Sequence, residues 1–123
     1  LALSPNKLRL YDATGTPLRS TQGEFTAATF RPGTHSIAAA RTNGRQSSVA
    51  TLGGDSFFSG PGSIDGLTAS PDGKWLLIAW PTANQWLLVN PHADARTIHA
   101  IANVPSQFRS LTFPRAAEWC CRR

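Results

Sequence analysis

The amino-acid sequence predicts an all-β fold built from repeated antiparallel four-stranded sheets. Residues 29–33, Thr-Phe-Arg-Pro-Gly, recur at residues 68–73 as Thr-Ala-Ser-Pro-Asp-Gly, and each copy precedes two apolar runs. A third, partial copy, Leu-Thr-Phe-Pro, stands at residues 111–114. No long stretch shows the period of an amphipathic helix, so little helix is expected. Repetition of this kind is typical of stacked β architectures.

The spacing of the copies indicates the blades of a β-propeller. Pro32 and Pro71 lie 39 residues apart, and Thr68 and Thr112 lie 44 residues apart. Propeller repeats span about 40–45 residues, with four strands in each blade. A closed propeller contains about four to eight blades, which is more than a chain of 123 residues can supply. We therefore expect a single domain that forms a partial or open ring.

Residues 1–24 are predicted to form half of a blade. Residues 7–11 alternate between polar and apolar side chains, which is the pattern of a half-buried strand. A turn at residues 12–15 leads to an outer strand at residues 16–20. Pro17 is tolerated in that strand because an edge strand need not donate every N–H group.

Residues 25–63 are predicted to form a complete blade. A turn at residues 31–34 joins its first two strands, and Asn43-Gly44 predicts a tight hairpin between the second and the third. The alanines of the second strand suit the crowded inner part of a blade. We expect the strands at residues 25–30, 36–40, 47–52 and, from a weak signal, 56–58.

Residues 64–105 are predicted to form a second complete blade. Pro, Asp and Gly at positions 71–73 supply turn chemistry after the first strand. The apolar run at residues 75–80 is typical of a strand that is buried on both faces. Further strands are expected at residues 85–89 and 97–101. Residues 106–123 would begin another blade, with its first strand at residues 108–113.

The composition bears on possible partners. The chain has 12 Lys and Arg against seven Asp and Glu, a formal net charge of +5. Its basic residues are scattered and do not alternate with aromatic residues as in single-strand binding sites, which argues against a nucleic-acid partner. No apolar run approaches the roughly 18 residues of a membrane helix, so no transmembrane segment is expected. Residues 1–3 lack the basic region of a signal peptide.

The sequence contains no motif for catalysis, a metal or a cofactor, and we expect none of these. His35, His92 and His99 are too far apart in sequence to form a pair on one strand. Cys120 and Cys121 are adjacent, which strains a mutual disulfide and does not match zinc-site spacing. We interpret them as strand residues on opposite faces. A nucleophile elbow and a phosphate-binding loop are both absent from the sequence.

Three tryptophans, Trp75, Trp80 and Trp86, lie within 12 residues of one another. Packing between blades is one interpretation of this cluster, and contact with a ligand is the other. Trp80 precedes Pro81 at the end of a predicted strand. It is therefore the candidate for a surface ligand contact.

Residues 68–77, Thr-Ala-Ser-Pro-Asp-Gly-Lys-Trp-Leu-Leu, resemble the repeat of TolB-like and WD-repeat-like β-propellers. In those families a Ser-Pro-Asp-Gly-Lys turn links the innermost strand of a blade to the next strand. Residues 29–38 are a degraded second match, and residues 7–18 resemble the later strands of the repeat. The Gly-His and Trp-Asp marks of WD repeats are absent, which favours the TolB-like side.

The resemblance implies a non-catalytic interaction module that binds protein or peptide through loops on a rigid ring. The remaining blades would come from a longer chain or from self-association. Two alternatives stay open: the propeller domain of a larger, peptidase-type hydrolase, and a small carbohydrate-binding propeller completed by self-association. The resemblance also implies an extracytoplasmic location, either periplasmic or secreted.

Overall fold

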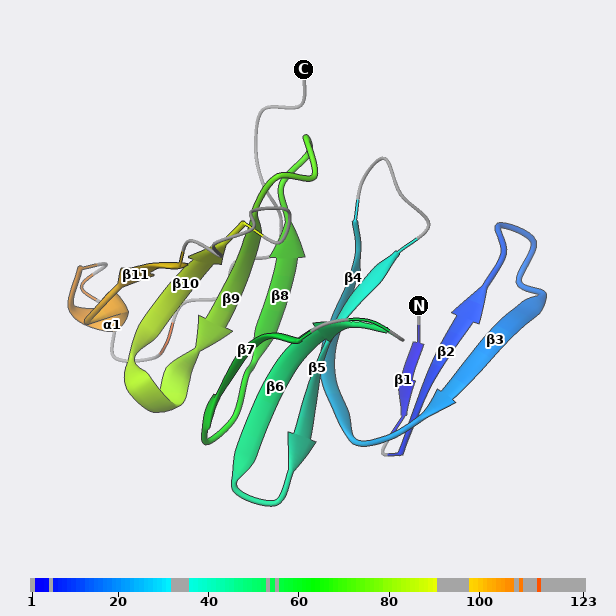
Figure 1. Cartoon of the computed structure of the whole chain (residues 1–123), viewed down its shortest axis with the longest axis horizontal. Coiled ribbons are helices and arrows are strands. Elements are labelled where there is room, and N and C mark those ends of the chain that lie inside the picture. The colour runs from blue at the N-terminus through cyan, green and yellow to red at the C-terminus, as the bar shows by residue number, and fades with distance from the viewer. Residues whose placement is uncertain are drawn as a thin grey trace.

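The computed structural model describes residues 2–4, 6–31, 36–52, 54, 56–90, 98–107, 109 and 113. These residues form three antiparallel sheets and two very short helices (Figure 1). Within each sheet the strands lie side by side in the order in which they occur along the chain. The expected all-β fold with four-stranded antiparallel sheets is confirmed.

The first sheet has three strands, β1 (Ala2–Ser4), β2 (Lys7–Tyr11) and β3 (Pro17–Gln22). The two expected strands are present as β2 and β3, and β3 extends two residues beyond the predicted end. The sequence reasoning missed β1, which is short and pairs antiparallel with β2. Figure 1 shows this sheet at one end of the row of three sheets.

The second sheet contains the four expected strands, and the weakly predicted fourth strand runs to Pro61. Residues 32–35, which include most of the expected first turn, lie outside the described residues. The predicted Asn43-Gly44 hairpin joins the second and third strands, because the register places Asn43 opposite Gln46. The strands are β4 (Phe25–Phe30), β5 (Ile37–Asn43), β6 (Gln46–Thr51) and β7 (Ser56–Pro61).

The third sheet also has four strands. A 3-10 helix, η1 (Pro81–Ala83), forms the connection between its second and third strands. A single helical turn, α1 (Val104–Gln107), follows the sheet. The strands are β8 (Gly66–Ala69), β9 (Leu76–Trp80), β10 (Gln85–Val89) and β11 (Ile98–Ile101).

A closed network of hydrogen bonds holds the turn between β8 and β9, which has the sequence Ser-Pro-Asp-Gly-Lys-Trp. The Ser70 hydroxyl donates to the Asp72 carboxylate at 2.6 Å, and that carboxylate also accepts from the Lys74 backbone N–H at 3.0 Å. The Trp75 N–H donates to the Ser70 hydroxyl oxygen at 3.0 Å. Trp75 therefore belongs to the turn, and β9 begins one residue later than predicted.

Asp12 has the same role in the turn between β2 and β3. Its Oδ1 atom accepts from the Thr14 hydroxyl at 2.7 Å and from the backbone N–H groups of Thr14 and Thr16 at 2.9 and 2.8 Å. The hydroxyl bond from Thr14 is the main reason why the pKa of Asp12 is below its ordinary value. In the same way the Ser70 hydroxyl, followed by the Lys74 N–H, lowers the pKa of Asp72.

The second sheet packs between the other two. Its strand β4 contacts β8 of the third sheet and β1 of the first sheet. The larger core joins the second and third sheets and includes Ala38, Ala40 and Val49 together with Ile78 and residues of β10. A smaller core joins the first and second sheets and consists of Leu8, Phe25, Ile37 and Ala39. Successive residues of β5 therefore face opposite neighbours.

Several predictions concern residues outside the described part of the chain. The expected strand at residues 108–113 is described only at residues 109 and 113, and Cys120 and Cys121 are not described. The division of the chain at residues 24, 63 and 105 stays a prediction about blades. The described helices contain no segment that is long and apolar enough to cross a membrane.

Replacing Ser70 with alanine should destabilise the fold. The Ser70 side chain is buried, with 4% of its surface exposed, and its hydroxyl both donates and accepts within the turn. Removing one partner from a buried hydrogen-bond network costs about 1–3 kcal/mol. Urea unfolding of Ser70→Ala, with exposed Ser106→Ala as the control, measures this cost. An unchanged unfolding free energy in Ser70→Ala would contradict the role of the turn.

The two aspartate turns should make stability depend on pH. Because the folded pKa values of Asp12 and Asp72 are lowered, both carboxylates stabilise the fold above the ordinary aspartate pKa. That contribution is lost as the pH falls from about 5 toward about 2. The double variant Asp12→Asn/Asp72→Asn should lose less stability over this range than the parent protein. Equal losses in thermal melts of the two proteins would show that these turns do not contribute.

Candidate binding cleft between the first two sheets

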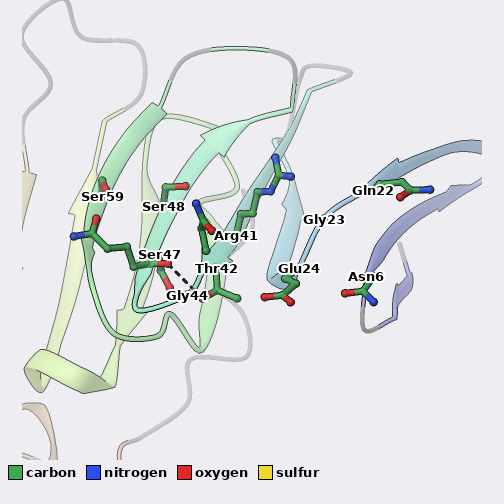
Figure 2. A pocket seen from close by; sticks show the side chains of 12 residues that line it. Asn6, Gln22, Gly23, Glu24, Arg41, Thr42, Gly44, Ser47, Ser48 and Ser59 are labelled. Atoms are coloured by element: carbon green, nitrogen blue, oxygen red, sulfur yellow. Dashed lines mark hydrogen bonds between the residues drawn. The ribbon is translucent and has the colours of Figure 1, made fainter.

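A polar cleft opens between the first and second sheets, at the end where the β1–β2 and β5–β6 hairpins lie (Figure 2). Its volume is about 1010 Å³. Every residue that lines it is polar, charged or glycine. The lining residues are Asn6, Gln22, Gly23, Glu24, Arg41, Thr42, Asn43, Gly44, Gln46, Ser47, Ser48 and Ser59.

The cleft forms because one face of β5 changes from apolar to polar along its length. Ile37 and Ala39 occupy the face toward the first sheet and pack in the small core. Arg41 and Asn43 continue the same face, since side chains alternate along a strand. These polar side chains do not join the apolar core, so the space between the sheets opens at this end.

Arg41 is held in place by its neighbours. Its guanidinium carbon lies 5.7 Å from the centre of the Phe25 ring, which is cation–π distance. Its Nε atom would lie 2.8 Å from a Cβ atom at Gly23, so only glycine leaves room for the side chain in this position. The backbone of Gly23, with φ of 145°, is also one that other residues rarely adopt. The Arg41 side chain is exposed, and its contact with Phe25 places the guanidinium at the cleft.

Backbone and hydroxyl bonds fix the frame of the cleft. The Thr42 N–H donates to the Glu24 carbonyl at 2.9 Å and ties β5 to the start of β4. The buried Ser47 hydroxyl donates to the Gly62 carbonyl at 2.7 Å, and the Gly62 N–H donates to the Arg45 carbonyl at 2.8 Å. These bonds hold the β5–β6 hairpin against the end of β7. The lining groups therefore rest on paired strands.

The lining groups suit an uncharged or anionic polar ligand. Figure 2 shows Arg41, Thr42 and Ser48 on the second sheet, and Asn6 and Gln22 on the first. Amide and hydroxyl groups can both donate and accept hydrogen bonds, as the backbone of a peptide requires. A guanidinium recognises a carboxylate through two parallel bonds. No aromatic side chain is among the lining residues, so the cleft offers no ring on which a sugar could stack.

Trp80, the candidate predicted from the sequence, lies away from this cleft and connects the second and third sheets. Its ring packs edge-on against Phe58, with 4.9 Å between ring centroids and an angle of 67°. Its indole N–H donates to the Pro61 carbonyl at 2.9 Å, and a Cβ atom at Gly60 would touch the ring. Trp80 is half-buried, and its role as a ligand contact stays a prediction.

The other candidate residues do not meet in one place within the described part of the chain. The Trp75 ring lies 5.8 Å from the His99 ring, on the third sheet. His35 and His92 lie outside the described residues. Among the residues that are described, no three His, Cys, Asp or Glu side chains gather as a metal site would require.

The sequence reasoning missed the cleft because its residues are distributed between positions 6 and 59. Each of them is an ordinary turn or strand residue when taken alone. The available signal was the change on β5 from Ile37 and Ala39 to Arg41 and Asn43 at alternate positions. No protein-family model, curated protein or solved structure matches the chain.

Substitutions of Trp80 should reveal how much it contributes to packing. Trp80→Ala should destabilise the protein by about 3 kcal/mol, because it removes the ring between the sheets. Trp80→Phe keeps an aromatic ring but loses the bond to the Pro61 carbonyl and part of the indole surface, so its cost should be smaller, about 1–2 kcal/mol. Urea unfolding of both variants measures these costs. Parent-like stability of Trp80→Ala would contradict the packing role.

Proposed function

We propose that the chain is part of a β-propeller that acts as a non-catalytic interaction module and binds a peptide segment in the cleft. The order of the strands supports a propeller. In a propeller the strands of each blade run outward in chain order, and the inner strands of neighbouring blades adjoin. The contact between β4 and β8, the first strands of consecutive sheets, has this form.

The three sheets are fewer than the roughly four to eight blades of a closed ring. Further blades would belong to a longer chain or to a second copy of this one, and they would continue an open ring from the third sheet. Light scattering on the 123-residue chain separates these sources. A dimer at micromolar concentration supports extension of the open ring by self-association, and a monomer supports the longer chain.

The observation that carries peptide binding is the position of Arg41, the one cationic residue of the lining, among uncharged donors and acceptors and one acidic residue, Glu24. An extended peptide presents N–H and C=O groups to the amides and hydroxyls of the cleft. An aspartate, a glutamate or a terminal carboxylate of that peptide would pair with the guanidinium. The formal net charge of +5 also favours an anionic segment over a cationic one.

The cleft favours a peptide over the carbohydrate alternative. Hydroxyl and amide groups would bind either ligand, but sugar sites commonly add an aromatic ring and none is among the lining residues. A catalytic domain of the peptidase-type alternative would lie outside residues 1–123, and no described residue bears on it.

A titration followed by amide NMR tests the proposal. The first probe is an eight-residue peptide of Asn, Ser and Gln with one central Asp, and the second is maltohexaose. The peptide should shift the amide signals of Gly44, Gln46 and Ser48, which line the cleft. A response of these signals to maltohexaose alone, or a response only near Trp80, would contradict peptide binding in the cleft.

Removing the guanidinium should weaken peptide binding about tenfold or more, because a hydrogen bond to a charged group contributes about 1.5–3 kcal/mol and about 1.4 kcal/mol is a factor of ten. The variant is Arg41→Gln, and Arg109→Gln is the control because Arg109 is exposed and outside the cleft. Isothermal titration measures both dissociation constants. Equal constants for Arg41→Gln and the parent protein would exclude the proposed role of Arg41.

A paired glycine experiment separates the position of Arg41 from backbone strain. Gly23→Ala should weaken peptide binding as much as Arg41→Gln, because the new Cβ atom displaces the guanidinium. Gly15→Ala is the matched control, since Gly15 also has a positive φ, of 87°, but has no atom within 4 Å of an added Cβ. Gly15→Ala should lose stability and keep its affinity. The same affinity in both variants would contradict the positioning of Arg41.

A further inference from the structure

The face of the first sheet that points away from the second sheet is cationic. Leu8 and Leu10 of β2 pack toward the second sheet, in the smaller core. Lys7, Arg9 and Tyr11 alternate with them and therefore occupy the opposite face. Arg9 is exposed, whereas Arg19 stands opposite Leu10 in the register and so belongs to the other face.

A shallow hollow of about 380 Å³ lies on this sheet. Two of the residues that line it, Lys7 and Arg9, are cations on this face, and none of the lining residues is acidic. Three others, Tyr11, Pro17 and Leu18, offer apolar surface, and Leu18 is 61% exposed. The full lining is Lys7, Arg9, Tyr11, Pro17, Leu18, Arg19 and Ser20. It shares no residue with the polar cleft.

This face of the first sheet, unlike the packed face of the third sheet, is not suited to an apolar neighbouring sheet. On β10, the third strand of that sheet, Leu87 and Val89 face the preceding sheet and are buried in the larger core. On β2, the middle strand of the first sheet, Arg9 and Tyr11 lie on the face that points away from the second sheet. An apolar sheet packed there would leave the Arg9 guanidinium without water or a counter-charge, which is costly.

We propose that this face docks an extended, acidic segment of a partner protein, in which acidic and apolar residues alternate. Lys7 and Arg9 stand two residues apart on β2, about 6.6 Å along the strand, which is also the spacing of alternate side chains in an extended partner segment. Carboxylates of that segment pair with the cations, and its apolar side chains cover Leu18 and Tyr11. A nucleic acid would place phosphates against Leu18 and Pro17, so the protein segment fits better.

Fluorescence anisotropy with a labelled eight-residue peptide of alternating Glu and Leu tests the proposal. The parent protein should bind this peptide, and binding should weaken at least fivefold between about 50 and 300 mM salt, because exposed charges are screened. Arg9→Glu should weaken binding about tenfold. Arg109→Glu makes the same change in net charge away from the hollow and should weaken it less than twofold.

Each of the following outcomes would overturn the proposal. Equal weakening by Arg9→Glu and Arg109→Glu would show that net charge alone acts. A loss in Arg41→Gln would place the peptide in the polar cleft, which separates this result from the test of the proposed function. Tighter binding of a 12-nucleotide oligo-dT than of the peptide would favour a nucleic acid. Should Arg9→Glu fail to fold, Arg9→Gln replaces it, and unchanged affinity in that variant counts against the proposal.

Discussion

Burial of the second sheet on both faces is the constraint on which the rest of the structure depends. Its strand β5 contributes Ile37 and Ala39 to the core with the first sheet, and Ala38 and Ala40 to the core with the third sheet. Ala38 and Ala40 have no exposed surface. A larger side chain at Ala38 or Ala40 would overpack the interface with the third sheet, and one at Ala39 the interface with the first, because protein interiors are close-packed. The alanine run therefore sets how closely the three sheets approach one another.

The candidate site lies at the end of β5 where this burial on both faces stops. Beyond Ala40 the chain reaches Arg41 and the hairpin, and the interface with the first sheet changes from an apolar contact to a polar cleft. Phe25 belongs to the small core and also lies beneath the Arg41 guanidinium. The Phe25 ring thus packs in the core and also contacts the guanidinium that we assign to ligand binding.

The sequence predicted the strands well where turn chemistry and alternation were strong, as at Asn43-Gly44 and at the Pro71–Gly73 turn, although Trp75 joins that turn and not the strand. It missed β1, because a strand of three residues carries too little alternation to recognise. It also missed the cleft, since Asn6 and Arg41 come together only when two sheets pack. Trp80 was recognised as a cluster member, but its bond to the Pro61 carbonyl depends on β7, which the sequence marked only weakly.

Amide hydrogen exchange measures the central constraint most directly. If β5 is packed on both faces, the N–H groups of Ala38, Ala39 and Ala40 should exchange only through global unfolding, with the largest protection in the chain. The N–H groups of β3, whose residues are mostly exposed at the edge of the first sheet, should exchange through local opening. Protection of β5 no greater than that of β3 would contradict a second sheet buried between two neighbours.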